Sequence, residues 1–189
     1  MTTRPSSPPQ RYVALLRAIN VGGHVVKMDV LRAEFSALRF TEVETFIASG
    51  NVLFTAPSAD RAALEQTIEQ RLEKTLGYEV GTFLRTPAEL STLVASLPFS
   101  ERELDGCTLS IAFLKREPAT AAAERVHLLC TDDDALLVRD RELFWRCRGR
   151  TSDSKVWRKP METVIGMSGT FRNVTTVRKL AAKTAGVSR

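Results

Sequence analysis

Residues 12–24 read YVALLRAINVGGH, and this stretch sets the pattern for the first half of the chain. Its first eight residues are apolar except for Arg17, which is typical of a strand covered on both faces of a sheet. The strand ends in a loop that contains two successive glycines, at positions 22 and 23. Beyond the loop, Asp29 is a suitable N-cap for a helix whose apolar residues recur at helical spacing to about residue 40. The stretch therefore predicts a strand, a glycine loop and a helix in succession.

Two more strands, a second helix and a last strand complete the first half. The predicted elements are a strand at 43–48, a strand at 52–55, a helix from the N-cap Asp60 to the C-cap Gly77, and a strand at 80–85. The two middle strands are joined through Ser49, Gly50 and Asn51, where glycine can adopt the positive φ of a tight hairpin. The resulting order, β-α-β-β-α-β, is that of the ferredoxin-like fold.

The second half repeats this order with one gap. The predicted elements are a strand at 108–114, a helix at 118–129, strands at 135–138 and 143–147, a helix at 153–165 and a final helix at 174–184. We therefore predict an α+β protein of two ferredoxin-like (βαββαβ-type) lobes in one compact chain, the second lobe lacking a clear last strand. The expected boundaries are a disordered leader at 1–10, a first lobe at 11–86, a connecting helix at 87–100, and a second lobe with a basic C-terminal helix at 101–189.

Composition excludes several classes of protein. The 189 residues are 43% hydrophobic, which is enough for a proper core. No apolar run approaches the roughly 20 residues that span a bilayer, and the N-terminus lacks the apolar segment of a secretion signal. Cys107, Cys130 and Cys147 form no C-x-x-C pair, which favours free thiols in a reducing compartment. We expect a soluble, cytoplasmic protein without a membrane partner or a metal.

Positive charge is concentrated at the end of the chain. Residues 146–189 carry 11 Lys and Arg against 2 Asp and Glu, whereas residues 1–97 carry 10 of each kind. Such a surplus attracts phosphate groups, although it also serves plain solubility. Trp145 and Trp157 lie among these basic residues, as in nucleic-acid-binding proteins that stack bases on aromatic rings, while packing in the core is the alternative. Nucleic acid is therefore one candidate partner.

The ferredoxin-like order brings two remote loops together. Because neighbouring strands are antiparallel, the loop after the first strand and the hairpin at Ser49, Gly50 and Asn51 must leave the sheet at the same end. The loop supplies Asn20, two glycines and Lys27 beside a helix N-terminus, a combination that favours a small anionic or phosphorylated ligand. The alternative is structural: the glycines serve turns, and Asn20 and Asn51 lock the two loops by hydrogen bonds to the backbone.

Two further side chains belong to this corner. Arg17 either reaches it as a buried guanidinium or pairs with a carboxylate such as Glu44. His24 is either a general base or hydrogen-bond donor, or an ordinary loop residue. The predicted ligand-binding set at the corner is Arg17, Asn20, Gly22, Gly23, His24, Lys27, Ser49, Gly50 and Asn51.

Arg172 and Asn173 form a second candidate for ligand binding. They precede the final helix, so exposed N–H groups and a guanidinium could together hold a phosphate or carboxylate. Alternatively, Asn173 only caps the helix and Arg172 ties loops together by hydrogen bonds.

Groups suited to catalysis are few. Ser154 and Lys155 are neighbours on a predicted helix and diverge by about 100°, so they cannot act on each other as a dyad. Residues 132–134 are three aspartates without the spacing or glycine of a calcium loop, which indicates a solvated turn. The sequence assigns no reaction and indicates neither a cofactor nor an oligomeric state.

Several of these segments carry a resemblance to a known family. They are 19–24, 49–51 and their flanking residues 15–17, 27–28 and 52–54, together with Ser154-Lys155 and 172–177. In them the chain resembles the bacterial proteins known as domain of unknown function 1697. The resemblance extends from about Tyr12 to the C-terminal helix. It implies a shared fold and draws attention to these residues, but it implies no substrate.

Overall fold

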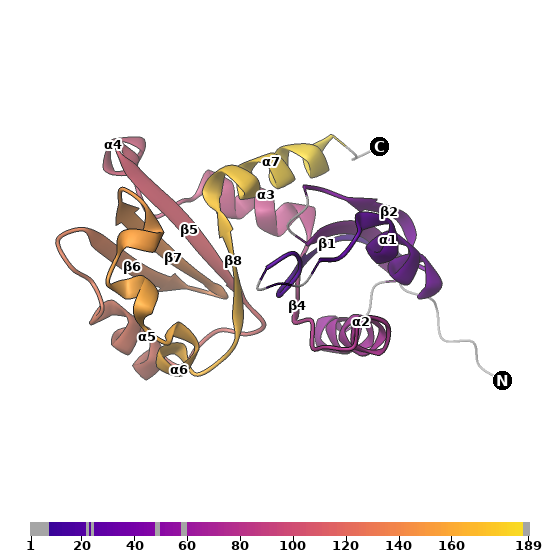
Figure 1. Ribbon diagram of the computed structural model, residues 1–189. Helices are drawn as coiled ribbons and strands as arrows, with labels where there is room; N and C mark the ends of the chain where they lie inside the picture. The colour runs from indigo at the N-terminus through magenta and orange to yellow at the C-terminus, as the bar shows by residue number, and fades with distance from the viewer. Residues whose placement is uncertain (1–7, 22, 24, 48–49, 58–59, 187–189) are drawn as a thin grey trace. The chain divides into compact units, whose positions relative to one another are not determined.

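The computed structural model describes residues 8–21, 23, 25–47, 50–57 and 60–186. The chain divides into two compact units, Met1–Glu89 and Leu90–Arg189 (Figure 1). Most of the leader expected at 1–10 lies outside the described residues, but Pro9 and Gln10 already belong to the first strand. None of the described helices combines the length and the apolar character needed to cross a membrane.

The first unit has the predicted ferredoxin-like order. Its elements are β1 (Pro9–Leu16), α1 (Met28–Ala37), β2 (Thr41–Thr45), β3 (Asn51–Pro57), α2 (Arg61–Leu76) and β4 (Thr82–Arg85). The strands form one antiparallel sheet in the order β2-β3-β1-β4. The α+β prediction and the strand order are therefore confirmed for this unit.

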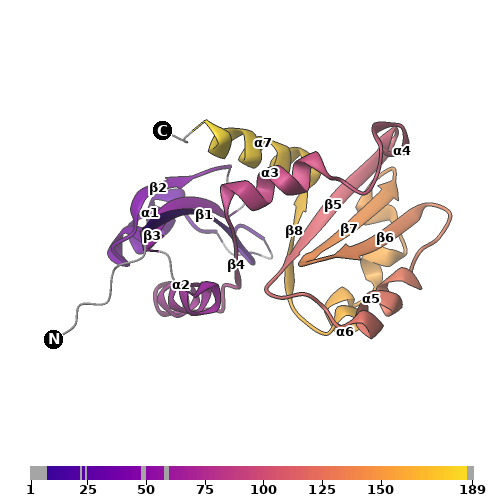
Figure 2. The ribbon, with the colours of Figure 1, turned by 180° about the vertical axis from the view of Figure 1, so that it is seen from behind.

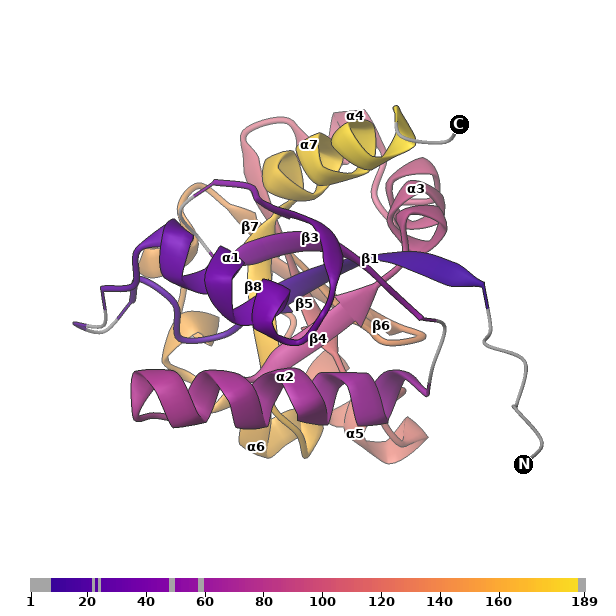
Figure 3. The ribbon, with the colours of Figure 1, turned by 90° about the vertical axis from the view of Figure 1, so that its right-hand side faces the viewer.

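Every second side chain of β1 packs into the core of the first unit. Tyr12, Ala14 and Leu16 point to the face that α1 and α2 cover (Figure 3). Phe35 of α1 and Ile68 of α2 are fully buried against this face. Because side chains of a strand alternate between the two faces, the apolar run of β1 can fill the core on this side and still bury residues on the other.

The predicted caps are correct for α2 and wrong for α1. Asp60 caps α2 by accepting a hydrogen bond from a backbone N–H, and Gly77 closes the helix with a φ of 79°. Asp29 was the wrong N-cap for α1, because Lys27 occupies that position and no side chain caps the helix. Asp29 instead lies in the first turn and pairs with Arg32. A carboxylate is also favourable there, beside the positive end of the helix dipole.

The second unit repeats the fold of the first. Its elements are α4 (Glu101–Leu104), β5 (Cys107–Leu114), α5 (Thr120–His127), β6 (Asp134–Arg139), β7 (Glu142–Arg148), α6 (Met161–Ile165), β8 (Gly169–Asn173) and α7 (Val174–Ala185). The sheet order β6-β7-β5-β8 matches that of the first unit, with α5 and α6 on one face (Figure 2).

The last strand that the sequence left unassigned is therefore present as β8. It pairs along its whole length with β5. Phe171 is its only large apolar residue, and Gly169 weakens its intrinsic strand propensity. Because pairing with β5 stabilises this strand, the residues of the strand alone did not predict it.

The helix predicted at 153–165 is wrong. The chain there forms two 3₁₀ turns, η1 (Thr151–Asp153) and η2 (Val156–Arg158), before the short helix α6. Lys159 is extended, with a ψ of 139°, and is followed by Pro160. Because proline has no N–H and disfavours helical backbone in the residue before it, a continuous helix cannot pass this point.

Each unit continues beyond its fourth strand into a further helix. The helix α3 (Pro87–Ala95) follows β4, and α7 follows β8. Glu89 N donates to Thr86 Oγ1 at 3.2 Å, and Thr175 N donates to Asn173 Oδ1 at 2.8 Å. Both helices thus begin with side-chain caps, and the repeated element order extends to these helices.

Candidate functional site

The corner predicted in the first unit forms at one end of its sheet. Leu16 N donates to the carbonyl oxygen of Gly50 at 2.7 Å, and Arg17 N donates to that of Gly81 at 2.8 Å. The end of β1 is therefore hydrogen-bonded to the β2–β3 hairpin on one side and to the approach to β4 on the other. The two remote loops leave the sheet at the same end, as the strand order requires.

Gly50 and Asn51 hold the hairpin. Gly50 has a φ of 70°, and a Cβ there would lie 2.9 Å from Cβ of Ile19, so no larger side chain fits. Asn51 is 0% exposed, and its Nδ2 donates to the carbonyl oxygen of Phe46 at 3.0 Å. These contacts favour the locking role over a ligand contact for Asn51, because a ligand would have to displace the hairpin to reach its amide.

Asn20 organises the loop between β1 and α1. Its Oδ1 accepts a hydrogen bond from Val26 N at 2.7 Å, across six residues. Its φ of 56° lies in the left-handed region, which asparagine tolerates better than most residues. Gly23 also has a positive φ, 89°, at an exposed turn. Asn20 thus defines the loop, and its carboxamide oxygen is already occupied by the backbone.

The cations of the corner lie on the surface. Arg17 follows β1 directly and is exposed, so the buried guanidinium was the wrong alternative. Glu44, the carboxylate suggested as its partner, lies 4.0 Å from the guanidinium of Arg11. Lys27 is exposed at the start of α1. Gly22, His24 and Ser49 lie outside the described residues.

Arg172 and Asn173, the second predicted pair, belong to the other unit. Arg172 is 9% exposed, and its Nη1 donates to Thr170 Oγ1 and to the carbonyl oxygen of Phe171, both at 2.9 Å. Burial lowers the pKa of Arg172 from its usual value to about 10, so the side chain stays cationic at neutral pH. Asn173 caps α7 through its side chain. These contacts match the tying and capping roles, and the arginine is not displayed at the surface.

Some basic side chains of residues 146–189 form ion pairs with carboxylates, which reduces the positive charge that they present. Arg148 Nε lies 3.3 Å from Asp133 Oδ1, and Arg150 Nε lies 3.2 Å from Asp153 Oδ2. Trp145 is 2% exposed, so it is not available to stack on a base, and the side chain of Trp157 lies outside the described residues.

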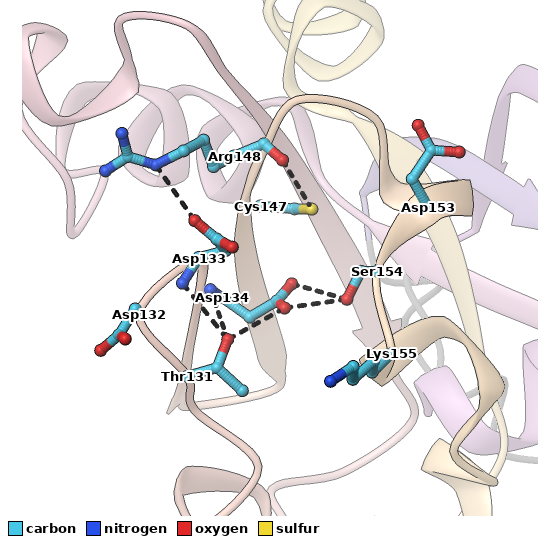
Figure 4. A pocket seen from close by; sticks show the side chains of 9 residues that line it. All are labelled: Thr131, Asp132, Asp133, Asp134, Cys147, Arg148, Asp153, Ser154 and Lys155. Atoms are coloured by element: carbon cyan, nitrogen blue, oxygen red, sulfur yellow. Dashed lines mark hydrogen bonds and ion pairs between the residues drawn. The ribbon is translucent and has the colours of Figure 1, made fainter.

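A polar cavity of about 370 Å³ opens in the second unit between the start of β6 and the loop after β7 (Figure 4). It is lined by Thr131, Asp132, Asp133, Asp134, Cys147, Arg148, Asp153, Ser154 and Lys155. The Ser154-Lys155 segment of the family resemblance thus lies in its wall. Most of the lining carboxylates face solvent, but Asp134 is only 4% exposed.

Asp134 is the centre of a hydrogen-bond network in this cavity. Its Oδ1 accepts from Trp145 Nε1 at 2.8 Å. Both carboxylate oxygens accept from Ser154 Oγ, at 2.8 and 2.9 Å (Figure 4). Thr131 Oγ1 adds a further contact at 3.2 Å. The expectation of a solvated turn at 132–134 is therefore wrong for Asp134. A buried carboxylate is stable only when donors satisfy it, and these three side chains do so.

The hydroxyl of Ser154 is both a hydrogen-bond donor and a hydrogen-bond acceptor. It donates to Asp134 and accepts a hydrogen bond from Val156 N at 2.9 Å. Ser154 therefore links the start of β6 to the loop before α6. Asp134 is already engaged by Trp145 and Thr131, and the Ser154 oxygen is engaged by a backbone N–H, so this arrangement suits structural support better than activation of a nucleophile.

Cys147 is equally unsuited to nucleophilic chemistry. Burial, followed by the hydrogen bond and the charge of Asp134, raises the pKa of its thiol from 9.0 to about 11. The reactive thiolate is therefore scarce at neutral pH. Among the residues that the structure describes, no three His, Cys, Asp or Glu side chains are arranged to hold a metal ion.

One feature of the sequence could have predicted the burial of Asp134, although the three successive aspartates indicated a solvated turn. Asp134 lies two residues before Leu136 and four before Val138, so alternation places it on the same face as these apolar residues. An aspartate on the inward face of a strand calls for buried donors. Which donors would meet it depended on the path of the loop after β7.

Comparison with known proteins agrees with this architecture. A family model described as "Protein of unknown function (DUF1697)" matches residues 10–144. No curated protein matches the chain. Among solved structures, it is similar to the conserved bacterial protein SP0830 from Streptococcus pneumoniae, with 24% sequence identity and a TM-score of 0.74 over 94% of this chain and 99% of that chain. This likeness supports the fold alone, whereas the family match spans well over half of the sequence. The chain therefore belongs to the DUF1697 family.

Proposed function

We propose that the protein binds a small anionic ligand, such as a phosphorylated metabolite, at the corner between the β1–α1 loop and the β2–β3 hairpin. The observation that carries the proposal is the start of α1. This ten-residue helix begins at Lys27 without a side-chain cap. Helix N-termini present backbone N–H groups and a partial positive charge, both of which favour an anion.

The surrounding charges support an anion in this position. Lys27 and Arg17 are exposed and belong to segments that leave the sheet at the same end. Asp29, the acidic residue of the first helical turn, is paired with Arg32, which offsets its repulsion. With Asn20 and Asn51 engaged in shaping the loops, the ligand would rest on backbone N–H groups and cations rather than on carboxamides.

The test is ligand-induced thermal stabilisation at constant ionic strength. Inorganic phosphate at 100 times its Kd should stabilise the protein by about 2.7 kcal/mol. Lys27→Ala should lose most of this stabilisation, because it removes the cation nearest the helix start. Arg39→Ala is the matched control, since Arg39 is an exposed cation just beyond the C-terminal end of α1, at the opposite end of that helix from Lys27.

Two outcomes would contradict the proposal. Equal stabilisation of the Lys27 and Arg39 variants would place the anion elsewhere, and the absence of any stabilisation by phosphate or nucleotides would rule out an anion site at this corner. Retention on heparin or transfer RNA that falls steeply with salt would instead favour nucleic-acid binding through the basic last third.

A further inference from the structure

The strand β6 lies at one edge of the second sheet, which has the order β6-β7-β5-β8 (Figure 2). Backbone N–H and C=O groups on the outer side of an edge strand have no neighbouring strand to pair with, and proteins usually cover them. In the first unit, two glutamates of α2 cover the edge strand β4. Glu69 Oε1 accepts from Thr82 N at 2.7 Å. Glu65 Oε1 accepts from Leu84 N at 2.8 Å.

The edge of β6 is covered only over its first half. The carbonyl oxygen of Asp134 accepts from Thr131 N at 2.8 Å. Leu136 N donates to Cys130 Sγ at 3.2 Å. Because the direction of the backbone groups alternates along a strand, Val138 also turns its N–H and C=O away from β7. Among the described residues, neither of these two groups has a hydrogen-bond partner, so this part of the edge is open to a further strand.

An apolar groove of about 560 Å³ lies beside the open edge, between α5 and β6. Leu128 of α5 and Leu137 of β6 line it, and their side chains are 81% and 40% exposed. Among the described residues of the second unit, these are the large apolar side chains that are clearly exposed. An unpaired strand edge beside an apolar groove suits an extended peptide, because the edge bonds its main chain and the groove takes its alternate side chains.

The charges around the groove indicate which kind of peptide fits. Residues 120–140 carry five Asp and Glu against two Lys and Arg, in a chain with a net charge of +5. Both arginines, Arg125 and Arg139, already donate to backbone carbonyl oxygens. Glu124 lines the groove and is exposed, and Asp140 is exposed at the end of β6. A strand flanked by Lys or Arg is therefore attracted, whereas a second copy of this acidic edge is repelled.

We propose that the edge of β6 binds an extended segment of a partner protein as an additional strand. Apolar side chains of that segment lie in the groove against Leu128 and Leu137, and a Lys or Arg lies beside Glu124. Val138 forms both of its outward backbone hydrogen bonds with the added strand. This surface belongs to the second unit and does not depend on the anion site proposed for the first.

Two heptapeptides with the same alternating centre, KVTVTVK and EVTVTVE, test the role of charge. Fluorescence anisotropy of the labelled peptides gives their affinities for the full chain. KVTVTVK should bind about tenfold more tightly at low salt, and the difference should shrink as the ionic strength rises. Glu124→Lys should abolish or reverse the preference. Glu73→Lys is the matched control, because Glu73 is an exposed carboxylate on α2 of the first unit.

Amide hydrogen exchange followed by NMR tests the addition of a strand. The Val138 amide should exchange rapidly in the free protein and be protected in the complex with KVTVTVK. The Leu137 amide, which faces β7, should be protected in both. Leu128→Ser should weaken the binding of KVTVTVK by about fivefold, because it removes apolar contact area from the groove. Val25→Ser is its control, since Val25 is 89% exposed in the first unit.

Several results would overturn the proposal. Equal affinity for the two peptides would remove the argument from charge, and binding that leaves the Val138 amide unprotected would show that no strand is added. Failure of both peptides to bind would reject the groove as a peptide site. A dimer detected by light scattering in the wild-type chain and lost in Leu137→Lys would also overturn the proposal, because a second copy would then occupy the edge.

Discussion

Replacement of Asp134 should destabilise the second unit more than any replacement of its acidic neighbours. Asp134→Ala removes the acceptor of the buried Trp145 Nε1–H, which lies 2.8 Å away, and leaves that donor unpaired. An unsatisfied buried donor costs about 1–3 kcal/mol. Ser154 and Thr131 also lose their partner, but Ser154 is half-buried and Thr131 is exposed, so both can bond to water. We expect a total loss of about 2–4 kcal/mol in the free energy of unfolding.

The assay is urea unfolding followed by tryptophan fluorescence. Both tryptophans of the chain belong to the second unit, so the signal reports on that unit. Exchange of the Trp145 indole proton, followed by NMR, adds a local readout. The proton should be protected in the wild-type protein and exchange readily in Asp134→Ala, because its hydrogen bond is absent.

Two variants test whether the loss of stability in Asp134→Ala comes from the broken hydrogen bonds or from the loss of a negative charge. Asp133→Ala removes an exposed carboxylate paired with Arg148 and should change stability by less than about 0.5 kcal/mol. Asp134→Asn keeps one oxygen for Trp145 and should cost less than half as much as alanine. If Asp134→Ala proves as mild as Asp133→Ala, or if asparagine is as harmful as alanine, the reasoning from the unpaired indole is refuted.

Two further predictions concern the hairpin and the buried thiol. Gly50→Ala should destabilise the first unit by about 2 kcal/mol or more in urea unfolding, because its Cβ would lie 2.9 Å from Cβ of Ile19 at a φ of 70°. Cys147, with a pKa raised to about 11, should react with iodoacetamide at pH 8 far more slowly than Cys107 and Cys130, which are partly exposed. Its contribution to stability should be lost as the pH rises from about 9 to about 11, since the folded state keeps a proton that the unfolded chain releases.

The Gly50 prediction and the iodoacetamide prediction each have a control within the same chain. Gly23→Ala meets nothing within 4 Å and should show only the smaller cost of its positive φ, so equal losses at both glycines would contradict the steric argument. The three cysteines should react at similar rates in 8 M urea, about where unfolding is complete for most small proteins. A slow Cys147 in the unfolded chain would show that burial is not the cause.

The sequence was most informative where the signals were local. Asp60 and Gly77 bound α2 as predicted, because capping depends on the conformations of a few neighbouring residues. The cap at Asn173, given as one of two interpretations of that residue, has the same local basis. From the order of these elements the ferredoxin-like strand order followed, and with it the meeting of two remote loops at one end of the first sheet.

Local signals failed where a partner from elsewhere in the chain decided the outcome. The strand β8 contains one large apolar residue and forms because β5 pairs with it. Ser154, 20 residues from Asp134, meets it only because the loop after β7 does not continue as the predicted helix. Lys27 and Arg17 were named from the sequence, but their exposure followed from which neighbours entered the core.

The sequence by itself therefore determined the family, the class of fold and the order of its elements, since periodicity and caps report backbone preferences of adjacent residues. Only the tertiary structure decided which polar groups are buried. Asp134 was predicted to lie in a solvated turn, and Asn51 and Arg172 each had a ligand-binding and a structural interpretation, but all three are buried. The free energy of a buried polar group depends on the donors and acceptors around it, and for Asp134 the donors Trp145 and Ser154 lie 11 and 20 residues away along the chain, so only folding brings them together.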